Sequence, residues 1–178
     1  MKLTIREITQ IGLFAAAIAV GAQVIVPLPG MVPMTLQVWA ILFASVILGA
    51  KKAALATVVY VLMGAAGLPV FAGLGGGIGV ILGPTGGFIL TFPIVALIVG
   101  LTEGKSRRAL IAALPLALFI NFAGGAAYFA IVTQNTMQAA FVAAVLPFLP
   151  AALLQTIVFA IWGPQLRMLA AQLRKYEL

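Results

Sequence analysis

Residues 36–67 read LQVWAILFASVILGAKKAALATVVYVLMGAAG, and this stretch decides the fold class. Two apolar runs, predicted as helices over Leu36–Ala50 and Ala53–Gly67, flank the lysine pair Lys51 and Lys52. Cationic residues stay on the cytoplasmic side when a membrane protein inserts. The stretch therefore predicts two membrane-spanning helices joined by a cytoplasmic turn. Both helices are short compared with a full span of about 20 residues.

The same charge pattern extends along the whole chain. All ten Lys and Arg residues fall in segments that alternating spans place on one side of the membrane: Lys2 and Arg6, Lys51 and Lys52, Lys105 with Arg107 and Arg108, and Arg167 with Arg174 and Lys175. The other predicted helices are Ile5–Val26, Thr85–Thr102, Ala109–Thr133 and one that begins near Pro147. The sequence thus predicts an all-α, multi-pass protein of the cytoplasmic membrane. Six transmembrane helices form one integral membrane domain, residues 1–178, with both termini cytoplasmic.

The composition excludes most soluble and metal-dependent functions. The chain is 64% hydrophobic and 7% charged, with a mean hydropathy of +1.24, which is more apolar surface than one soluble core can hide. It contains no Cys and no His, so thiolate chemistry, metal sites and metal cofactors are not expected. The net charge of +7 comes in small clusters beside apolar runs, which indicates membrane topology rather than nucleic-acid binding.

An intramembrane enzyme is an alternative class that the residues disfavour. All three acidic residues, Glu7, Glu103 and Glu177, lie at the predicted cytoplasmic margins. No acid–base pair is therefore expected within the bundle. The chain is predicted not to be an enzyme.

The predicted outer segments are irregular. Residues 27–37, PLPGMVPMTLQ, hold three prolines and are expected to form an ordered outer loop. Residues 68–87, LPVFAGLGGGIGVILGPTGG, are too apolar for a solvated loop and too rich in glycine for a stable helix. Non-helical backbone at membrane depth is tolerated where it is buried in protein or lines a cavity. This glycine-rich outer loop between the third and fourth helices is therefore the first candidate for a binding site.

The end of this loop predicts a helix start. In Gly83-Pro84-Thr85-Gly86-Gly87, Pro fits a first helical turn and Thr can cap it. The free N–H groups there can bind an anion or a carbonyl group. The alternative is a helix cap that only ends the loop. The absence of water in a membrane favours a ligand site.

Polar residues within or beside the apolar runs are further candidates: Thr35, Gln37, Asn121, Tyr128 and Gln155. Such groups face the bundle interior or a cavity. For Asn121, near mid-membrane, hydrogen bonding between helices is an equally good interpretation. For Gln155 the position favours contact with a ligand.

Small residues line one face of the first helix: Gly12, Ala15, Ala16, Ala19 and Ala22 recur at spacings of three and four. Such a face allows another helix to approach closely. The approaching helix can belong to a partner protein or to the same bundle, and periodicity does not separate the two.

Four strings resemble the BioY family: VPMTLQ at 32–37, GLPVFAG at 67–73, GVILGPTGGF at 79–88 and LPFLP at 146–150. Members of this family are the substrate-capture (S) components of energy-coupling factor (ECF) biotin transporters. The resemblance extends in order over nearly the whole chain. It implies an S-component bundle of six helices, biotin bound near the outer face, and partnership with a transmembrane coupling subunit and two ATPase subunits.

The resemblance also completes the predicted sites. It implies that Ala15 and Ala19 belong to the face that docks the coupling subunit. The predicted ligand-binding residues comprise Thr35, Gln37, Gly73, Gly75, Gly76, Gly77, Gly79, Pro84, Thr85, Gly86, Gly87, Phe88, Asn121, Tyr128, Ala152 and Gln155.

The sequence departs from the family pattern at two places. Where the family usually reads Gly-Asp-x-x-Lys after the LPFLP string, this chain reads Ala151-Ala152-Leu153-Leu154-Gln155, without either charge. Where the family usually has Tyr after GPTGG, it has Phe88. Three functions follow as hypotheses: biotin capture for uptake, capture of another small vitamin-like ligand by a divergent S component, and a membrane assembly subunit without ligand.

Overall fold

The computed structural model describes residues 3–26 and 32–175, with side chains described through residue 172. Lys2, Glu177, the side chains of Arg174 and Lys175, and the proline-rich string 27–31 of the predicted outer loop lie outside these ranges. The elements are α1 (Ile5–Gln23), β1 (Ile25–Val26), β2 (Met34–Thr35), α2 (Gln37–Leu48), α3 (Ala50–Ala65), the single 3₁₀ turn η1 (Ala72–Leu74), α4 (Ile78–Ile81), α5 (Gly86–Gly100), α6 (Arg107–Thr133), α7 (Met137–Ala144), the 3₁₀ turn η2 (Leu146–Phe148) and α8 (Leu149–Lys175).

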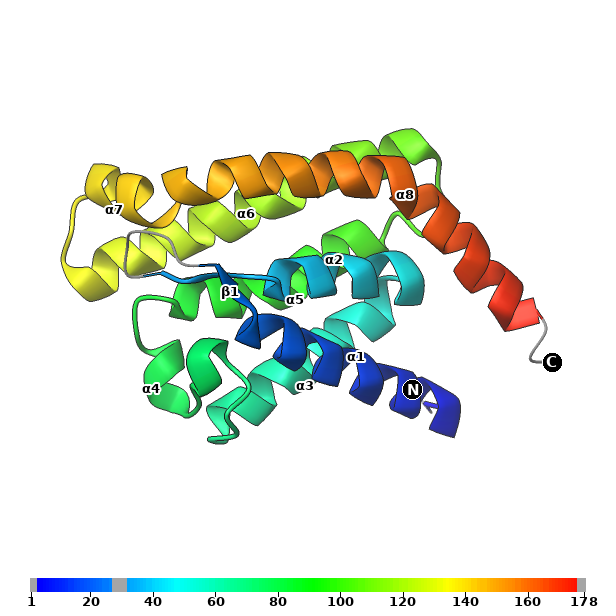
Figure 1. Cartoon of the computed structure of the whole chain (residues 1–178), viewed down its shortest axis with the longest axis horizontal. Coiled ribbons are helices and arrows are strands. Elements are labelled where there is room, and N and C mark those ends of the chain that lie inside the picture. Colours follow the sequence, from blue (N-terminus) through cyan, green and yellow to red (C-terminus); the bar gives the residue numbers. More distant parts are fainter. Residues whose placement is uncertain (1–2, 27–31, 176–178) are drawn as a thin grey trace.

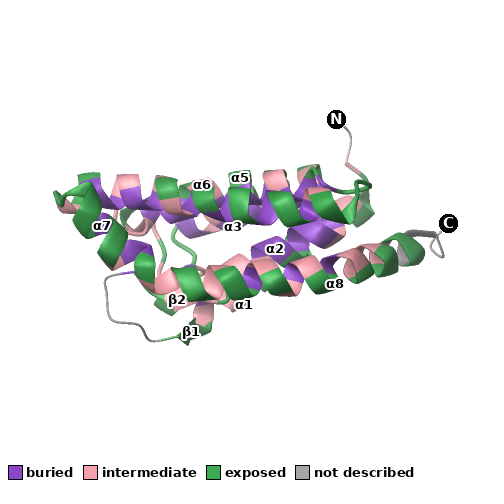
Figure 2. Ribbon diagram, turned by 90° about the horizontal axis from the view of Figure 1, so that it is seen from above, coloured by how far each residue is buried: buried purple, intermediate pink, exposed green. Residues whose placement is uncertain are grey.

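The basic segments of the described chain gather at one end of the helical bundle. Figure 1 shows both termini, the α2–α3 junction and the α5–α6 turn at the same end, while α4, α7 and the two strands lie toward the other. The buried residues face the interior, where the layers of helices meet (Figure 2). The charge pattern predicted that these segments share one side of a membrane, which requires them to lie at one end of the bundle.

Helix lengths divide the bundle into two groups. Within the described residues, three helical stretches are long and apolar enough to cross a membrane: Ile5–Gln23, Arg107–Thr133 and Met137–Gln172. The apolar helices α2 and α5 are shorter. With 12 residues and a rise of about 1.5 Å each, α2 measures only about 18 Å. The short helices are sheltered by neighbours, since α5 packs on α2, α3 and α6.

The first predicted helix is too long by three residues. α1 begins with a capping box, in which the Glu7 N–H donates to Thr4 Oγ1 at 3.3 Å and the Thr4 N–H donates to Glu7 Oε2 at 3.0 Å. It ends at Gln23, because Ile25 and Val26 pair in antiparallel register with Thr35 and Met34. A small sheet that the sequence analysis did not predict therefore fixes the chain beside the start of α2.

α5 packs closely against α6 through glycines. A Cβ atom on Gly87 would collide with Tyr128 Cβ and come within 2.7 Å of the Gly124 carbonyl oxygen. Facing it, a Cβ on Gly125 would collide with the ring of Phe88. Small residues at a helix interface let backbones approach closely in a membrane. Glycines on both sides of this contact bring α5 and α6 together.

We expect the substitution Gly87→Ala to destabilise the protein, because the added methyl group overpacks the α5–α6 contact. Overpacking costs typically about 1–3 kcal/mol. The matched control is Gly12→Ala on α1, where a Cβ meets nothing within 4 Å. Because Ala has a higher helix propensity than Gly, the Gly12→Ala variant should be as stable as the unaltered protein or slightly more stable. Unfolding of the purified variants in detergent measures both effects. Equal stability of the two variants would contradict the packing role of Gly87.

A second expected outcome concerns the orientation of the bundle. Leu74 is 68% exposed in η1, and Lys51 is exposed at the α2–α3 junction. The chain has no Cys of its own, so single introduced thiols can be labelled without background. In intact cells, a membrane-impermeant maleimide should label Leu74→Cys, whereas Lys51→Cys should react only after lysis. The reverse pattern would invert the topology.

Candidate functional site

A cavity of about 290 Å³ lies among the ends of several helices. Its wall comes from the β2 region, the start of α2, η1, α4, the first half of α5, the middle of α6 and the start of α8. The lining residues are Val32, Pro33, Met34, Thr35, Gln37, Val38, Phe71, Ala72, Val80, Thr85, Phe88, Ile89, Phe92, Leu118, Asn121, Phe122, Phe148, Ala151, Ala152 and Gln155. Apolar clefts of about this size with a few polar groups are typical small-molecule sites.

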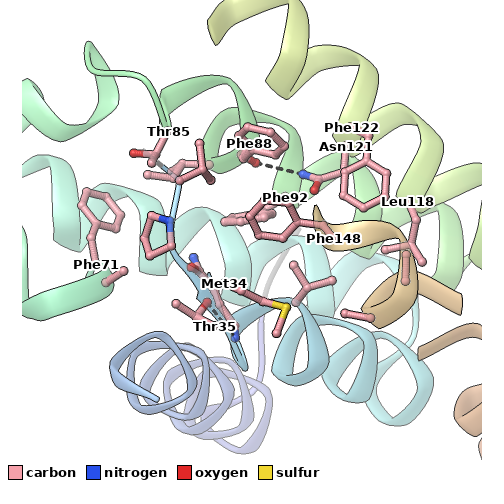
Figure 3. Close-up of a pocket in the computed structure, with 18 of the residues that line it drawn as sticks. Met34, Thr35, Phe71, Thr85, Phe88, Phe92, Leu118, Asn121, Phe122 and Phe148 are labelled. Atoms are coloured by element: carbon pink, nitrogen blue, oxygen red, sulfur yellow. Dashed lines mark hydrogen bonds between the residues drawn. The ribbon is translucent and has the colours of Figure 1, made fainter. Parts of the chain in front are cut away.

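Phenylalanine rings form much of the wall. Phe71, Phe88, Phe92, Phe122 and Phe148 surround the space from four parts of the chain (Figure 3). The Phe71 ring is held in turn, since it packs edge-on against Tyr60 with ring centroids 5.5 Å apart and occupies the space left by Gly64. Flat aromatic faces in fixed positions suit a compact, mostly apolar ligand.

The polar groups of the wall are neutral, because none of the lining residues is Asp, Glu, Lys, Arg or His. Gln37 is fixed by two bonds: its Nε2 donates to Tyr60 Oη at 2.8 Å, and its backbone N–H donates to Thr35 Oγ1 at 3.2 Å. Thr85, at the start of α5, makes no side-chain capping bond. The Gly86 N–H in the first turn of α5 donates to the Gly83 carbonyl oxygen at 3.0 Å.

Asn121 forms hydrogen bonds between helices and also lines the cavity. Its Nδ2 donates to the Phe88 carbonyl oxygen at 3.1 Å and to Thr91 Oγ1 at 2.8 Å, which ties α6 to α5. An amide nitrogen has two N–H donors, so these bonds use both. Asn121 is 2% exposed and lines the cavity (Figure 3). Its amide oxygen is the atom left to meet a ligand.

Ala152 and Gln155, the two positions where the family usually has charged residues, lie together on the cavity wall. Ala152 and Gln155 both line it, whereas Leu153 and Leu154 between them are 63% and 53% exposed on the outside of α8. The three-residue spacing therefore does place positions 152 and 155 on one helical face.

The glycine-rich segment is anchored by a residue that the sequence analysis did not single out. Gln23 Nε2 donates to the carbonyl oxygens of Val70 at 3.2 Å and Phe71 at 3.0 Å, and its Oε1 accepts the Leu74 N–H at 2.9 Å. From the other side, the Gly77 N–H donates to the Gly64 carbonyl oxygen at 2.7 Å. These bonds hold Phe71 and Ala72 against the cavity.

The predicted ligand residues divide by position. Thr35, Gln37, Thr85, Phe88, Asn121, Ala152 and Gln155 line the cavity. Gly73, Gly75, Gly76, Gly77, Gly79, Pro84, Gly86, Gly87 and Tyr128 are not part of its wall. Gly73, with φ of 67°, and Gly77, with φ of 89°, instead shape the turns of the outer loop. Tyr128 packs on Gly87 and donates its hydroxyl to the Ile81 carbonyl oxygen at 3.1 Å.

Only some of the small residues on the predicted docking face of α1 are exposed. Ala15 is 1% exposed within the chain's own bundle, and Ala22 is fully buried. Ala19 is half-buried and packs against the core. Gly12 and Ala16 are the exposed members of the small-residue face. Ala15 therefore packs within the chain and offers no accessible surface to a partner.

Several wall residues were missed from the sequence: Val32, Pro33, Met34, Val38, Phe71, Ala72, Val80, Ile89, Phe92, Leu118, Phe122, Phe148 and Ala151. Most are apolar residues in apolar runs, where composition does not distinguish a cavity wall from a packed core. Some of them could have been found only because they lie in the strings that resemble the BioY family. Phe71 and Ala72 lie in the GLPVFAG string, and Phe148 lies in the LPFLP string.

A model of the BioY family matches residues 1–172. The chain belongs to the BioY family. Over 102 residues it is 49% identical to a probable biotin transporter BioY of Pyrococcus horikoshii and 45% identical to a biotin transporter BioY of Thermotoga maritima. These matches cover 57% of this chain but only 62% and 60% of the two relatives. The biotin transporter BioY2 of Lactococcus lactis subsp. cremoris is 33% identical over 179 residues, which cover 96% of this chain and 94% of that relative.

A crystal structure of the S-component for biotin from an ECF-type ABC transporter has the same fold, with a TM-score of 0.82. The likeness covers 94% of this chain and 95% of that chain at 20% sequence identity. The predicted S-component-like helical bundle is confirmed. As a BioY protein with apolar helices long enough for a bilayer, the chain is a membrane protein.

We expect Gln23→Leu to loosen the glycine-rich segment while leaving the helices intact. The substitution keeps the side chain's bulk but removes three hydrogen bonds, each worth about 1 kcal/mol. Loss of even one such bond raises the population of locally open states about fivefold. Amide hydrogen exchange should therefore accelerate in residues 70–75. Gln10→Leu, on the same helix but far from this segment in sequence, is the control and should leave that exchange rate unchanged. Unchanged exchange in Gln23→Leu would remove Gln23 as the anchor.

Proposed function

We propose that this BioY protein captures biotin as the substrate-specific S component of an ECF-type transporter. The observation that carries the proposal is the cavity. All four strings that carry the family likeness contribute residues to its wall, which combines aromatic rings with a few neutral polar groups. The chain's relatives are named biotin transporters, and the solved structure of the same fold is an S component for biotin.

The chemistry of biotin suits this wall. Biotin consists of a fused cyclic urea and thioether ring with a flexible acid chain, so most of its surface is apolar and its ring system is compact. Such a ring system can lie against the phenylalanine faces, while the amide and hydroxyl groups of the wall supply hydrogen bonds. No group on the wall is suited to acid–base or nucleophilic chemistry. Binding and release, without a reaction, is the function supported.

In the proposed topology, six helices span the cytoplasmic membrane and the cavity opens near the outer face. Support comes from the position of the basic segments at the opposite end of the bundle. Transport further requires an energy-coupling module, proposed as a transmembrane coupling subunit with two ATPase subunits. The exposed small residues Gly12 and Ala16 on α1 leave a surface that a partner helix can approach.

Ala152 and Gln155 favour one alternative specifically. Because the family's usual charges are absent from this wall, a divergent S component with another small, uncharged vitamin-like ligand is the second candidate. Direct titration of the purified chain with biotin and with other vitamins separates the two. A third outcome, no binding of any vitamin, would indicate an assembly subunit.

We expect Ala152→Phe to abolish biotin binding, because the added ring fills space inside the cavity. Its matched control is Leu153→Phe, one residue along α8, where the side chain is 63% exposed on the outside of the bundle. The control should bind biotin with unchanged affinity, measured by titration in detergent. Loss of binding in both variants, or in neither, would place the biotin site elsewhere.

A further inference from the structure

A second hollow, of about 480 Å³, lies at the end of the bundle where the basic segments gather. Its wall comes from the end of α2, the turn between α5 and α6, and the part of α8 that begins at Pro164. Three of its lining residues, Lys105, Arg107 and Arg167, are basic, and one, Glu103, is acidic. We call it the basic hollow. It shares no lining residue with the cavity, and the proposed capture of biotin does not use it.

A proline bends α8 beside the basic hollow. Proline has no N–H to donate to the carbonyl oxygen four residues earlier, which for Pro164 belongs to Ala160. Arg107 Nε, at the start of α6, donates to that oxygen at 3.1 Å and so replaces the missing bond. Figure 1 shows the last part of α8, in red, turning away from the direction of the rest of the helix. The bend in α8 thus provides the acceptor that holds the Arg107 guanidinium at the wall.

Arg167, about one turn beyond the proline, is held from another side. Its Nη1 donates to the Thr102 carbonyl oxygen at 2.9 Å, and its Nη2 donates to Thr102 Oγ1. Thr102 is 5% exposed, and its hydroxyl donates to the Val99 carbonyl oxygen at 2.6 Å, so this acceptor has a fixed position. Because the acceptors of Arg167 in these bonds are neutral oxygen atoms, the bonds fix the guanidinium without cancelling its charge.

The other cationic groups of the hollow keep donors for a ligand. The terminal nitrogens of Arg107 and the ammonium group of Lys105 make no hydrogen bond or ion pair to another described residue. The carboxylate of the wall, Glu103, lies against Gly49 at the α2–α3 junction, where an added Cβ would collide with it. Three cations around one space repel one another. An anion in the hollow relieves that repulsion.

A neighbouring hollow of about 490 Å³ lacks this excess of positive charge. Its lining residues include Lys51 and Lys52 but also Glu7 and Glu103, two cations and two acids. Membrane insertion explains why cations gather at this end of the bundle. It does not explain why two arginines are fixed around one hollow while the charges of the other are balanced. The arrangement at the basic hollow therefore indicates a site for an anion.

The surface beside the basic hollow suits a lipid better than a soluble anion. Trp162, two residues before the bend, is 59% exposed, and Trp is enriched where a membrane meets water. Beyond the bend, Met168 and Leu169 are 60% and 54% exposed. A phospholipid carries a phosphate group and apolar chains on one molecule. Arginine pairs its N–H groups with phosphate oxygens, while exposed apolar side chains can lie against acyl chains.

We propose that the basic hollow binds the headgroup phosphate of an anionic phospholipid. The proposal rests on the proposed topology, which places this end of the bundle at the cytoplasmic leaflet, and not on the identity of the ligand in the cavity. Basic pockets between helices on that side of a membrane bind anionic headgroups. Arg107 and Lys105 contact the phosphate oxygens, Arg167 contributes its charge from the opposite wall, and an acyl chain lies along Met168. The bound lipid joins the bent end of α8 to the turn between α5 and α6.

The test is a competition between two lipids for the purified chain in detergent. Phosphatidylglycerol and phosphatidylcholine with the same acyl chains are added in equal amounts, and native mass spectrometry counts the bound molecules of each. The unaltered chain should bind phosphatidylglycerol at least about tenfold more than phosphatidylcholine. Glycerol 3-phosphate in large excess should not displace the lipid, because it has no acyl chains.

Two double variants remove the same charge from different hollows. Lys105→Gln with Arg107→Gln should lower the preference for phosphatidylglycerol at least about tenfold. Lys51→Gln with Lys52→Gln is the matched control and should keep the preference within about threefold. Arg107→Gln also removes the bond to the Ala160 carbonyl oxygen. Lys105→Gln alone breaks no side-chain bond within the described chain, and it should lower the preference about fivefold.

The outcomes separate this inference from the proposed function. An equal loss of preference in both double variants would show attraction to the basic surface as a whole and overturn the site. Displacement by glycerol 3-phosphate would assign the hollow to a soluble phosphate and overturn the lipid. No preference in the unaltered chain would overturn the inference outright. None of these outcomes depends on biotin, and a chain that binds no biotin but keeps the lipid preference would overturn the proposed function alone.

Discussion

Backbone groups inside an apolar bundle have no water to bond, and this constraint shapes the end of the molecule that holds the cavity. Residues 68–85 are mostly non-helical, so their N–H and C=O groups must find partners in the protein. Gln23 supplies three of these bonds from α1, and the Gly64 carbonyl oxygen supplies another from α3. The segment that looks least regular is therefore held from two sides. Its anchoring is what keeps Phe71 in the cavity wall.

The close approach of α5 and α6 also helps to hold the cavity wall in place. Glycines at the contact bring the two backbones together, and Asn121 adds hydrogen bonds across it. Asn121 donates to the backbone carbonyl oxygen of Phe88. The bond therefore also fixes the backbone at Phe88, which is a residue of the cavity wall. Helix packing and the cavity wall thus share residues on these helices. We therefore expect a substitution at the contact to change the shape of the cavity even where the altered residue is not part of the wall.

The sequence predicted the class of fold and several residues of the cavity wall for physical reasons. The position of charges along the chain follows from insertion, and helices follow from long apolar runs, so neither depends on tertiary detail. Gln155 and Asn121 were found because a polar residue in an apolar run needs an explanation. Phe92 and Phe122 were not found, because a phenylalanine in a cavity wall and one in a packed core look the same in sequence.

Glycines and alanines gave the least reliable assignments for a related reason. A missing side chain leaves room for a ligand, for another helix or for a turn, and the sequence does not say which. Gly87 makes room for Tyr128, Gly64 makes room for Phe71, and Gly77 permits a positive φ. Ala15 and Ala16 are adjacent, yet the bundle buries the first and exposes the second. The rotation of α1 about its own axis relative to the neighbouring helices decides which of the two alanines is buried. That rotation depends on the tertiary structure.

The separation of charge from the cavity determines what kind of recognition is available to it. On α8 the nearest described cation, Arg167, lies twelve residues from Gln155, which is about 18 Å along the helix, and its guanidinium donates to the Thr102 carbonyl oxygen at 2.9 Å. Topology keeps the cations at that end, so the cavity has no charge with which to attract or reject a ligand. Selectivity must then come from shape and from the loss incurred when a buried amide is left unpaired by the wrong ligand. A site of this kind distinguishes ligands by their hydrogen-bonding edges rather than by their net charge.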